Sequence, residues 1–216
     1  AIKTNKKLAE KLGINQSTAV TCVKPSGTVS QLVDAASGIH ARHNPYYIRT
    51  VRGDNKDPLT MFLQDKGVPS EPDFTAPDNV TVFSFPMKSP EGAICRYDMG
   101  ALEQLELWLK IADNYCEHKP SVTISVQEHE WLEVGAWCWE HFDSLSGISF
   151  LPFSDHSYKQ APYQDIDKEE FKDLTEKMPP AIDWYELSNY EKGDTTTGSQ
   201  ELACAGGVCE IVDIGA

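Results

Sequence analysis

Long apolar runs and basic residues are both scarce in this sequence of 216 residues, and each scarcity excludes a class of protein. No apolar run approaches the length that a membrane span needs, which argues against a membrane protein. Lysine and arginine together number 19 against 33 acidic residues, giving a formal net charge of -14. Because broad contact with nucleic acid needs a basic face, we expect no direct nucleic-acid partner, and any anionic ligand must be held locally.

A signal peptide is not expected either, because the first dozen residues form a Lys-rich amphipathic stretch without an apolar core or a cleavage site. The sequence begins at Ala1, and we expect a fragment or a processed product. With 40% hydrophobic and 24% charged residues, the composition is ordinary for a globular protein of one or two domains. We expect it to be cytoplasmic.

The six cysteines do not follow the spacing of a secreted disulfide framework. Four lie singly in or beside predicted strands and helices, where we expect reduced structural thiols: Cys22, Cys95, Cys116 and Cys138.

Cys204 and Cys209 instead share a Gly-rich segment near the C-terminus. Gly206 and Gly207 let the backbone turn, so the two thiols can approach each other with little strain. The pair could be a redox couple, a zinc site or without a role. A zinc site needs about four ligands with short spacings, which the sequence does not supply convincingly, so we expect no metal.

Hydrophobic periodicity predicts five strands interleaved mostly with helices. The strands are expected at residues 17–23, 46–52, 80–85, 121–126 and 148–151. The helices are expected at residues 1–13, 29–36, 58–66, from a cap at Asp98 to before His118, 128–142 and 167–178. Alternating strands and helices favour an α/β architecture with largely parallel pairing, because parallel strands need crossovers of this length. Five strands are awkward for a complete barrel.

Two details of these helices can be tested directly. Asp57 is expected to cap the helix at 58–66, with Pro58 at its first position. The helix at 128–142 is expected to bury some of a set of five residues: Trp131, Leu132, Gly135, Trp139 and Phe142.

A turn at residues 24–28 has the sequence Lys-Pro-Ser-Gly-Thr and joins a predicted strand to a short predicted helix. Backbone N–H groups at such a helix start lack intrahelical partners and point outward. Ser26 and Thr28 add hydroxyl donors, and Gly27 lets an oxyanion approach the backbone. The turn is therefore a candidate phosphate site, although a capped turn without a ligand explains the sequence equally well.

Other polar residues give weaker signals. In the next loop, His40, Arg42 and His43 could reach an anionic ligand, but solvated side chains are the favoured interpretation. Glu117 and His118 are interpreted as surface residues at a helix end rather than as an acid–base pair.

Several motifs are more specific together than any one of them. They lie at residues 22–30, 38–40, 46–52, 102–105, 118–123, 139–143, 149–152, 160–163 and 204–209. Together they resemble the C-terminal half of adenosylcobalamin-dependent (class II) ribonucleotide reductases, and look closest to the ribonucleoside-triphosphate reductase branch. The resemblance implies an α/β fold that is the second five-stranded half of a ten-stranded barrel, at residues 1–152. A peripheral segment at 153–188 and a flexible redox arm at 189–216 would follow.

The resemblance also implies roles for particular residues. Pro25, Ser26, Gly27 and Thr28 would bind the phosphates of a ribonucleotide substrate. Cys204 and Cys209 would form a swinging dithiol that reduces an active-site disulfide, and a thioredoxin-type partner would reduce the pair again. Radical chemistry would come from adenosylcobalamin, whose Co–C bond yields the radical that generates a protein thiyl.

The thiyl cysteine, the catalytic Asn and Glu, and one cysteine of the active-site disulfide belong to family segments upstream, and none maps onto this sequence. We therefore expect this chain to be inactive alone and to need the N-terminal part of a reductase. Two other functions fit the residues. One is a non-catalytic phosphate-binding α/β module whose terminal cysteines hold zinc or dock a partner, and the other is a free-standing dithiol reductase.

Overall fold

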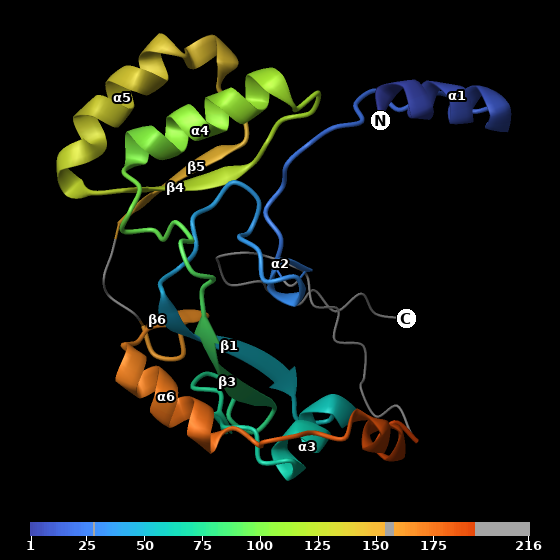
Figure 1. Ribbon diagram of the computed structural model, residues 1–216, viewed down its shortest axis with the longest axis vertical. Coiled ribbons are helices and arrows are strands. Elements are labelled where there is room, and N and C mark those ends of the chain that lie inside the picture. The colour runs from blue at the N-terminus through green and yellow to red at the C-terminus, as the bar shows by residue number, and fades with distance from the viewer. Residues whose placement is uncertain (28, 154–157, 193–216) are drawn as a thin grey trace. The chain divides into compact units, whose positions relative to one another are not determined.

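The computed structural model describes residues 1–27, 29–153 and 158–192 (Figure 1). The chain forms two compact units, each assembled from two separate stretches of sequence. The first unit takes its described residues from Ala1–Pro45 and Ser89–His156, and the second takes them from Tyr46–Lys88 and Ser157–Ala216. In the described ranges, no helix is both long and apolar enough to cross a membrane. The predicted functional boundaries after residues 152 and 188 stay predictions.

The first unit is built around two parallel strands and their covering helices. Its elements are α1 (Ile2–Leu12), α2 (Val29–Leu32), α4 (Ala101–Asn114), β4 (Val122–Val126), η1 (Glu128–Glu130), α5 (Trp131–Glu140), η2 (Phe142–Ser144) and β5 (Ile148–Pro152). Strand β4 pairs in parallel with β5, and Val122 lies opposite Ile148. This pair has the helical crossover that parallel strands require.

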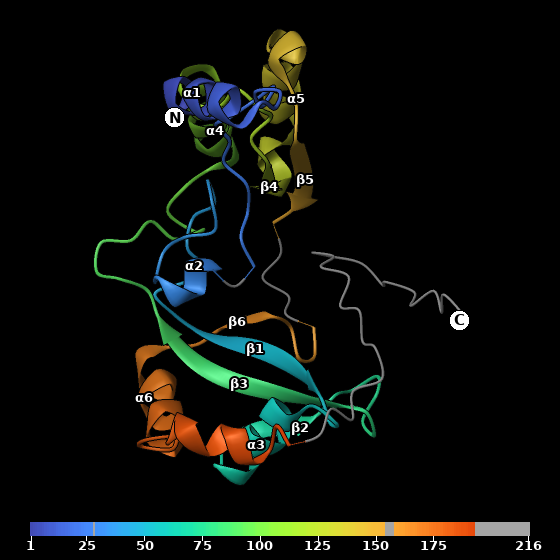
Figure 2. The same ribbon diagram turned by 90° about the vertical axis from the view of Figure 1, so that its right-hand side faces the viewer.

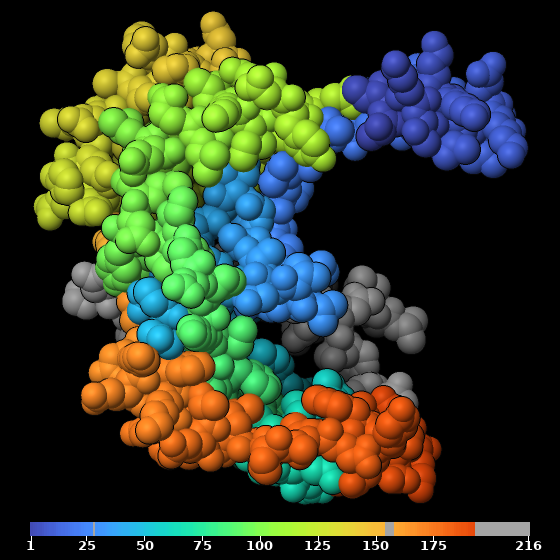
Figure 3. Space-filling model, in the orientation of Figure 1, coloured from blue at the N-terminus to red at the C-terminus, as the bar shows by residue number. Residues whose placement is uncertain are grey.

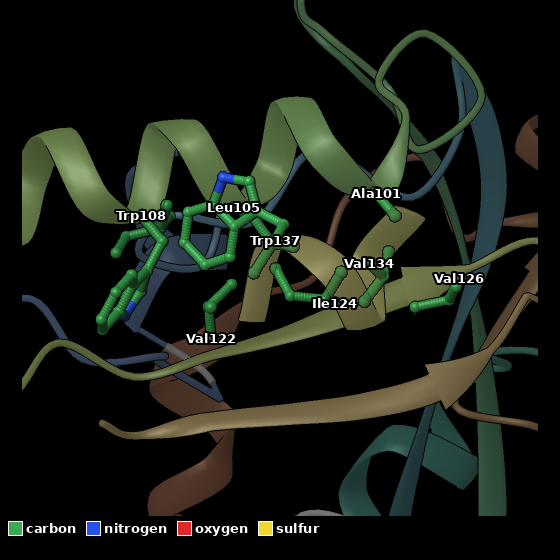
Figure 4. Packing of buried hydrophobic residues seen from close by; sticks show 9 residues of the cluster. Ala101, Leu105, Trp108, Val122, Ile124, Val126, Val134 and Trp137 are labelled. Atoms are coloured by element: carbon green, nitrogen blue, oxygen red, sulfur yellow. The ribbon is translucent and has the colours of Figure 1, made fainter. Parts of the chain in front are cut away.

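The core of the first unit forms where β4 faces α4 and α5 (Figure 4). Alternate residues of β4 are buried, as the period of a strand dictates, while α4 contributes residues spaced by three and four. The buried side chains from these three elements are Ala101, Leu105, Trp108, Val122, Ile124, Val126, Val134 and Trp137. Trp108 is fully buried, and its indole Nε1 donates to the carbonyl oxygen of Pro120 at 3.3 Å.

Helix α5 buries a different face from the one predicted. Val134 and Trp137 point into the core, whereas Leu132, Trp139 and Phe142 are 89%, 84% and 71% exposed. Gly135 is also exposed, and Trp131 is 40% exposed. The prediction was wrong because this helix carries apolar residues on two opposite faces, so the hydrophobic period alone does not select one. Figure 3 shows α5 on the surface of its unit.

The segment predicted as a strand at residues 17–23 is extended but forms no named strand. In the part of the chain that is described, its backbone groups form hydrogen bonds with residues outside the strands and with one side chain, and not with a neighbouring strand. The N–H of Ser121 donates to the carbonyl of Val23 at 3.1 Å, and the N–H of Val20 donates to Glu117 Oε2 at 2.7 Å. The last contact gives Glu117 a structural role.

The end of α2 and the start of α4 also differ from expectation. Helix α2 stops at Leu32, four residues earlier than predicted, and Asp34 then adopts a left-handed φ of 49°. Gly100, not Asp98, is the N-cap of α4, and Glu103 Oε2 accepts from its backbone N–H at 3.0 Å. Asp98 instead accepts from the N–H of Cys95, three residues before it.

The second unit contains a four-stranded antiparallel sheet in the order β2-β3-β1-β6. Its elements are β1 (Tyr46–Asp54), α3 (Pro58–Asp65), β2 (Ser70–Pro72), β3 (Val80–Lys88), β6 (Tyr163–Asp165), α6 (Lys168–Lys177) and η3 (Trp184–Asn189). The α/β class is confirmed, but the expectation of largely parallel pairing is wrong, because one sheet is antiparallel and the other is parallel. A long connection between two strands permits parallel pairing but does not require it. The connection after β1 leads through α3 and β2 to β3, which runs antiparallel to β1.

Helices α3 and α6 cover one face of this sheet, as Figure 2 shows. Phe62, Leu63, Val68 and Phe83 form the buried centre there. The predicted start of α3 is confirmed: Asp57 is its N-cap and accepts from the N–H of Leu59 at 2.9 Å, with Pro58 at the first position.

A buried polar cluster ties β2 and its following turn to the rest of the second unit. Asp73 is 4% exposed and accepts from Arg52 Nε at 2.8 Å and from the hydroxyl and N–H of Thr75 at 2.6 and 2.8 Å. Gln160, which is 5% exposed, donates to Glu71 and to the carbonyl of Pro72, both at 2.8 Å. Burial opposes ionisation of Asp73, but these hydrogen bonds outweigh it and hold the pKa of this carboxyl well below its usual range.

Replacing Asp73 with asparagine should lower the free energy of unfolding by about 2–4 kcal/mol at pH 7, because an amide leaves some of these buried donors without an acceptor. A carboxyl with a lowered pKa stabilises the fold above the ordinary Asp pKa, and that stability is lost as the pH falls. The difference between wild type and variant should therefore shrink by about 1.4 kcal/mol per pH unit below pH ~4. Urea unfolding at several pH values measures it.

The exposed Asp78 supplies a matched control for this experiment. Asp78→Asn should change stability by less than about 0.5 kcal/mol at pH 7. A gap between wild type and Asp73→Asn that stays constant from pH 5 to pH 2.5 would contradict the assigned role of the charge.

Candidate phosphate-binding site

The candidate phosphate turn lies in the first unit, between the extended segment and α2. Residues 24–27 are described, and Thr28 lies outside the described residues. Ser26 bonds to the first turn of α2, since its Oγ accepts from the N–H of Ser30 at 2.9 Å. The sequence thus forms the expected helix start, although the helix that follows is a single turn.

Ser37 determines which donors of the turn are free. Its Oγ accepts from the N–H of Ser26 at 2.8 Å and donates to the carbonyl of the same residue at 2.8 Å. Pro25 has no N–H to offer. Within the described part of the chain, the N–H of Gly27 and the hydroxyl hydrogen of Ser26 have no acceptor. A Cβ at Gly27 would meet nothing within 4 Å, so the backbone there is open to approach.

Lys24 places a positive charge at the base of the turn. Its Nζ donates to the carbonyl of Lys119 and to Ser121 Oγ, both at 2.7 Å, at the start of β4. Among the described residues, no carboxylate forms an ion pair with it. Both acceptors are neutral groups, so neither of them balances the charge of the ammonium.

Gly38 packs against the backbone at the start of the turn. Its φ is 63°, and a Cβ there would lie 2.8 Å from the carbonyl oxygen of Lys24. Neither Gly38 nor Ser37 was assigned a role from the residues themselves. The signal for both was the Ser-Gly pair at the point where the predicted helix had to end.

His40 and Arg42 are committed to the fold rather than solvated. His40 Nε2 accepts from the N–H of Thr123 at 3.0 Å, and Nδ1 contacts the carbonyl of Ser37 at 2.7 Å. Arg42 is 6% exposed and pairs with Asp34 at 2.7 Å. His43 is half-buried. The polar groups of His40 and Arg42 named here are therefore engaged by the protein and not waiting for an anion.

A shallow hollow of about 360 Å³ opens beside this region, and residues such as Ile39, His40, Pro90, Met99 and Leu107 line it. Adenosylcobalamin, with its corrin ring and nucleotide tail, is larger than the ligands that cavities of this size enclose. Both ring nitrogens of His40 already have protein partners. The described residues therefore do not fit this cofactor by themselves.

The four described cysteines are free thiols. Burial raises the pKa of the Cys95 and Cys138 thiols, which disfavours the reactive thiolate at both. Cys204 and Cys209, the candidate redox pair, lie outside the described residues. Over residues 1–27, 29–153 and 158–192, no group of three or more His, Cys, Asp or Glu side chains could hold a metal ion.

Comparison with known proteins finds relatives that are named adenosylcobalamin-dependent ribonucleoside-triphosphate reductase and that align with most of this chain. No family model matches it. The adenosylcobalamin-dependent ribonucleoside-triphosphate reductase of Lactobacillus delbrueckii subsp. bulgaricus is 29% identical over 216 residues, covering 97% of this chain and 29% of the relative. The enzyme of that name from Euglena gracilis is 33% identical over 173 residues, covering 79% of this chain and 24% of the relative.

A solved structure agrees with these relatives. The crystal structure of a B12-dependent (class II) ribonucleotide reductase matches with a TM-score of 0.74 and 27% identity, over 90% of this chain and 27% of that chain. The chain thus spans less than a third of the length of the proteins that it matches. Its homologues are adenosylcobalamin-dependent reductases, and its α/β fold is similar to that of the class II enzyme.

Proposed function

We propose that this chain is the C-terminal part of an adenosylcobalamin-dependent ribonucleoside-triphosphate reductase, which converts ribonucleotides to 2′-deoxyribonucleotides. The observation that carries the proposal is the agreement of sequence and structure over the same segment, with 97% of the chain aligned to one relative and 90% to the solved structure. On this proposal the segment supplies a substrate-phosphate loop and a reducing dithiol, and the N-terminal part of the reductase supplies the rest.

The phosphate loop comprises Pro25, Ser26, Gly27 and Thr28. Its geometry supports the proposal because the Gly27 N–H and the Ser26 hydroxyl have no acceptor among the described residues and because the space at Gly27 is open. A phosphate oxygen would accept from both donors. The Lys24 ammonium would add an attractive charge nearby, which matters in a chain of net charge -14.

The reducing dithiol is Cys204 with Cys209. Each reduction of a ribonucleotide removes the 2′-hydroxyl as water and leaves the active-site thiols oxidised to a disulfide. The pair would pass two electrons and two protons to that disulfide by thiol–disulfide exchange and would itself become a disulfide. A thioredoxin-type dithiol would then reduce it. Bound to the complete enzyme, adenosylcobalamin would supply the radical, and no step proposed for this chain runs through it.

A chimera tests the assignment: this chain replaces the matching segment of the L. delbrueckii reductase. We expect the chimera to reduce CTP with adenosylcobalamin and a small dithiol, and the isolated chain to show no turnover. In the chimera, Cys209→Ser should retain one round of reduction but lose at least about 90% of multiple turnover with thioredoxin, because the exchange partner is gone. Rapid-quench and steady-state assays of dCTP separate the two regimes.

Cys116→Ser is the matched control, because this half-buried thiol lies in the described fold and has no proposed part in exchange. It should leave multiple turnover unchanged. Undiminished multiple turnover in Cys209→Ser would sink the shuttle assignment. A chimera that folds, by circular dichroism, yet never yields dCTP would count against the reductase assignment as a whole.

A further inference from the structure

We propose that Ser37, Gly38 and His40 are positioning residues that hold the phosphate loop at a fixed place relative to β4. The inference rests on the proposed function, since the loop is taken to bind phosphate. It adds a set of residues that never touch the ligand, and it explains how a loop followed by a helix of one turn can be rigid.

The first contact of this set is the hydroxyl of Ser37. It closes a two-bond ring with the peptide groups of Ser26, accepting from the N–H and donating to the carbonyl, each at 2.8 Å. The carbonyl also accepts from Ser30 Oγ at 3.4 Å, whereas the N–H has Ser37 as its acceptor. The ring fixes the peptide groups on both sides of Ser26, one of which carries the Gly27 N–H, and it leaves that N–H and the Ser26 hydroxyl hydrogen without an acceptor among the described residues.

The second contact is the close approach of Gly38 to Lys24. The 2.8 Å between an ideal Cβ at Gly38 and the Lys24 oxygen is shorter than real Cβ contacts allow, so only glycine lets the two backbones lie this close. The left-handed φ of 63° at Gly38 also turns the chain so that Ser37 faces the loop.

The third contact connects the set to the core. His40 joins the carbonyl of Ser37 at 2.7 Å to the N–H of Thr123 in β4 at 3.0 Å. Because a backbone N–H is a donor, Nε2 must accept, and the ring hydrogen lies on Nδ1. The neighbouring Ile39 is 7% exposed and packs with the core cluster that contains Ile124. The loop is therefore connected to β4, whose alternate residues are buried in the core of the unit.

Ser37→Ala in the full chain tests the set, with inorganic tripolyphosphate as the probe. In wild type the Ser26 amide should exchange slowly with D₂O although its loop is largely exposed, and the variant should speed this exchange at least about tenfold, as loss of one hydrogen bond allows. The variant should also bind tripolyphosphate about tenfold more weakly, measured by NMR titration of the Gly27 amide. Ser37→Thr keeps the hydroxyl and should recover affinity to within about threefold.

Val134→Ala separates positioning from stability. This residue is 3% exposed in the core of the same unit and makes none of the three contacts, so its variant should lower Tm while leaving tripolyphosphate affinity unchanged. If wild type binds tripolyphosphate and Ser37→Ala binds it equally well, or if the wild-type Ser26 amide exchanges freely, this inference alone is overturned. If wild type does not bind tripolyphosphate at all, the phosphate loop of the proposed function fails and this inference fails with it.

Discussion

Replacing Gly38 with alanine is expected to lower the free energy of unfolding by about 2–5 kcal/mol and to abolish detectable binding of inorganic phosphates. Two costs combine. An alanine in the left-handed region costs about 1–2 kcal/mol, and forcing a methyl group against the Lys24 carbonyl adds about 1–3 kcal/mol. Backbone oxygen cannot rotate away as a side chain would, so the loop itself must shift. Chemical unfolding and NMR titration with tripolyphosphate measure the two effects.

Gly92 provides the matched control for this substitution. It lies in the same unit with a similar φ of 76°, but a Cβ there would meet nothing within 4 Å. Gly92→Ala should therefore cost only the backbone term, about 1–2 kcal/mol, and leave phosphate affinity intact. If the two variants lost equal stability, the close approach of Gly38 to Lys24 would add no steric cost to the alanine substitution.

Replacing Trp108 with alanine should cost about 3–5 kcal/mol, the largest loss expected from a single truncation in this chain. Its side chain is fully buried between α4 and β4, and its removal leaves a cavity and frees the carbonyl of Pro120 from its indole donor. Urea unfolding monitored by far-UV circular dichroism avoids the change in tryptophan fluorescence that the substitution itself causes.

Trp139→Ala removes the same side chain from an 84% exposed position on α5 and should cost less than about 0.5 kcal/mol. A small loss at Trp139 would show that its face of α5 is exposed, which the helical period alone did not decide, and Trp108 on α4 serves as the buried reference. A larger loss at Trp139 than at Trp108 would reverse the assignment.

Local signals in the sequence predicted local structure well. Asp57 and Pro58 mark the start of α3 because a cap and a fixed φ act within one turn of chain. Gly13, with its left-handed φ of 67°, ends α1 for the same kind of reason. Strand direction is not local: nothing in the residues of β1 and β3 specifies that Thr50 lies opposite Ser84 in an antiparallel ladder. Such pairings are decided by packing of distant segments.

The candidate site divides in the same way. The types and order of the turn residues made them a candidate phosphate site, and that role stays a prediction. The contacts of Ser37 and His40 could not be predicted, because they depend on how the chain folds back over eleven residues to Ser26 and over more than eighty to Thr123. Arg42 was expected to be solvated and is buried, and its ion pair with Asp34 joins two residues that lie eight positions apart beyond the end of α2.

The interleaving of the two units has a consequence for the order in which the protein can be made. The first unit needs β5, which ends at Pro152, and the second needs β6 and α6, which end at Lys177. Residues of the second unit emerge from the ribosome between the two parts of the first. Neither unit can complete its sheet until β5 or β6 has been synthesised, so the edge of β1 that pairs with β6 stays unpaired until then. Chaperone dependence during translation should exceed that of a protein of equal length whose domains follow one another.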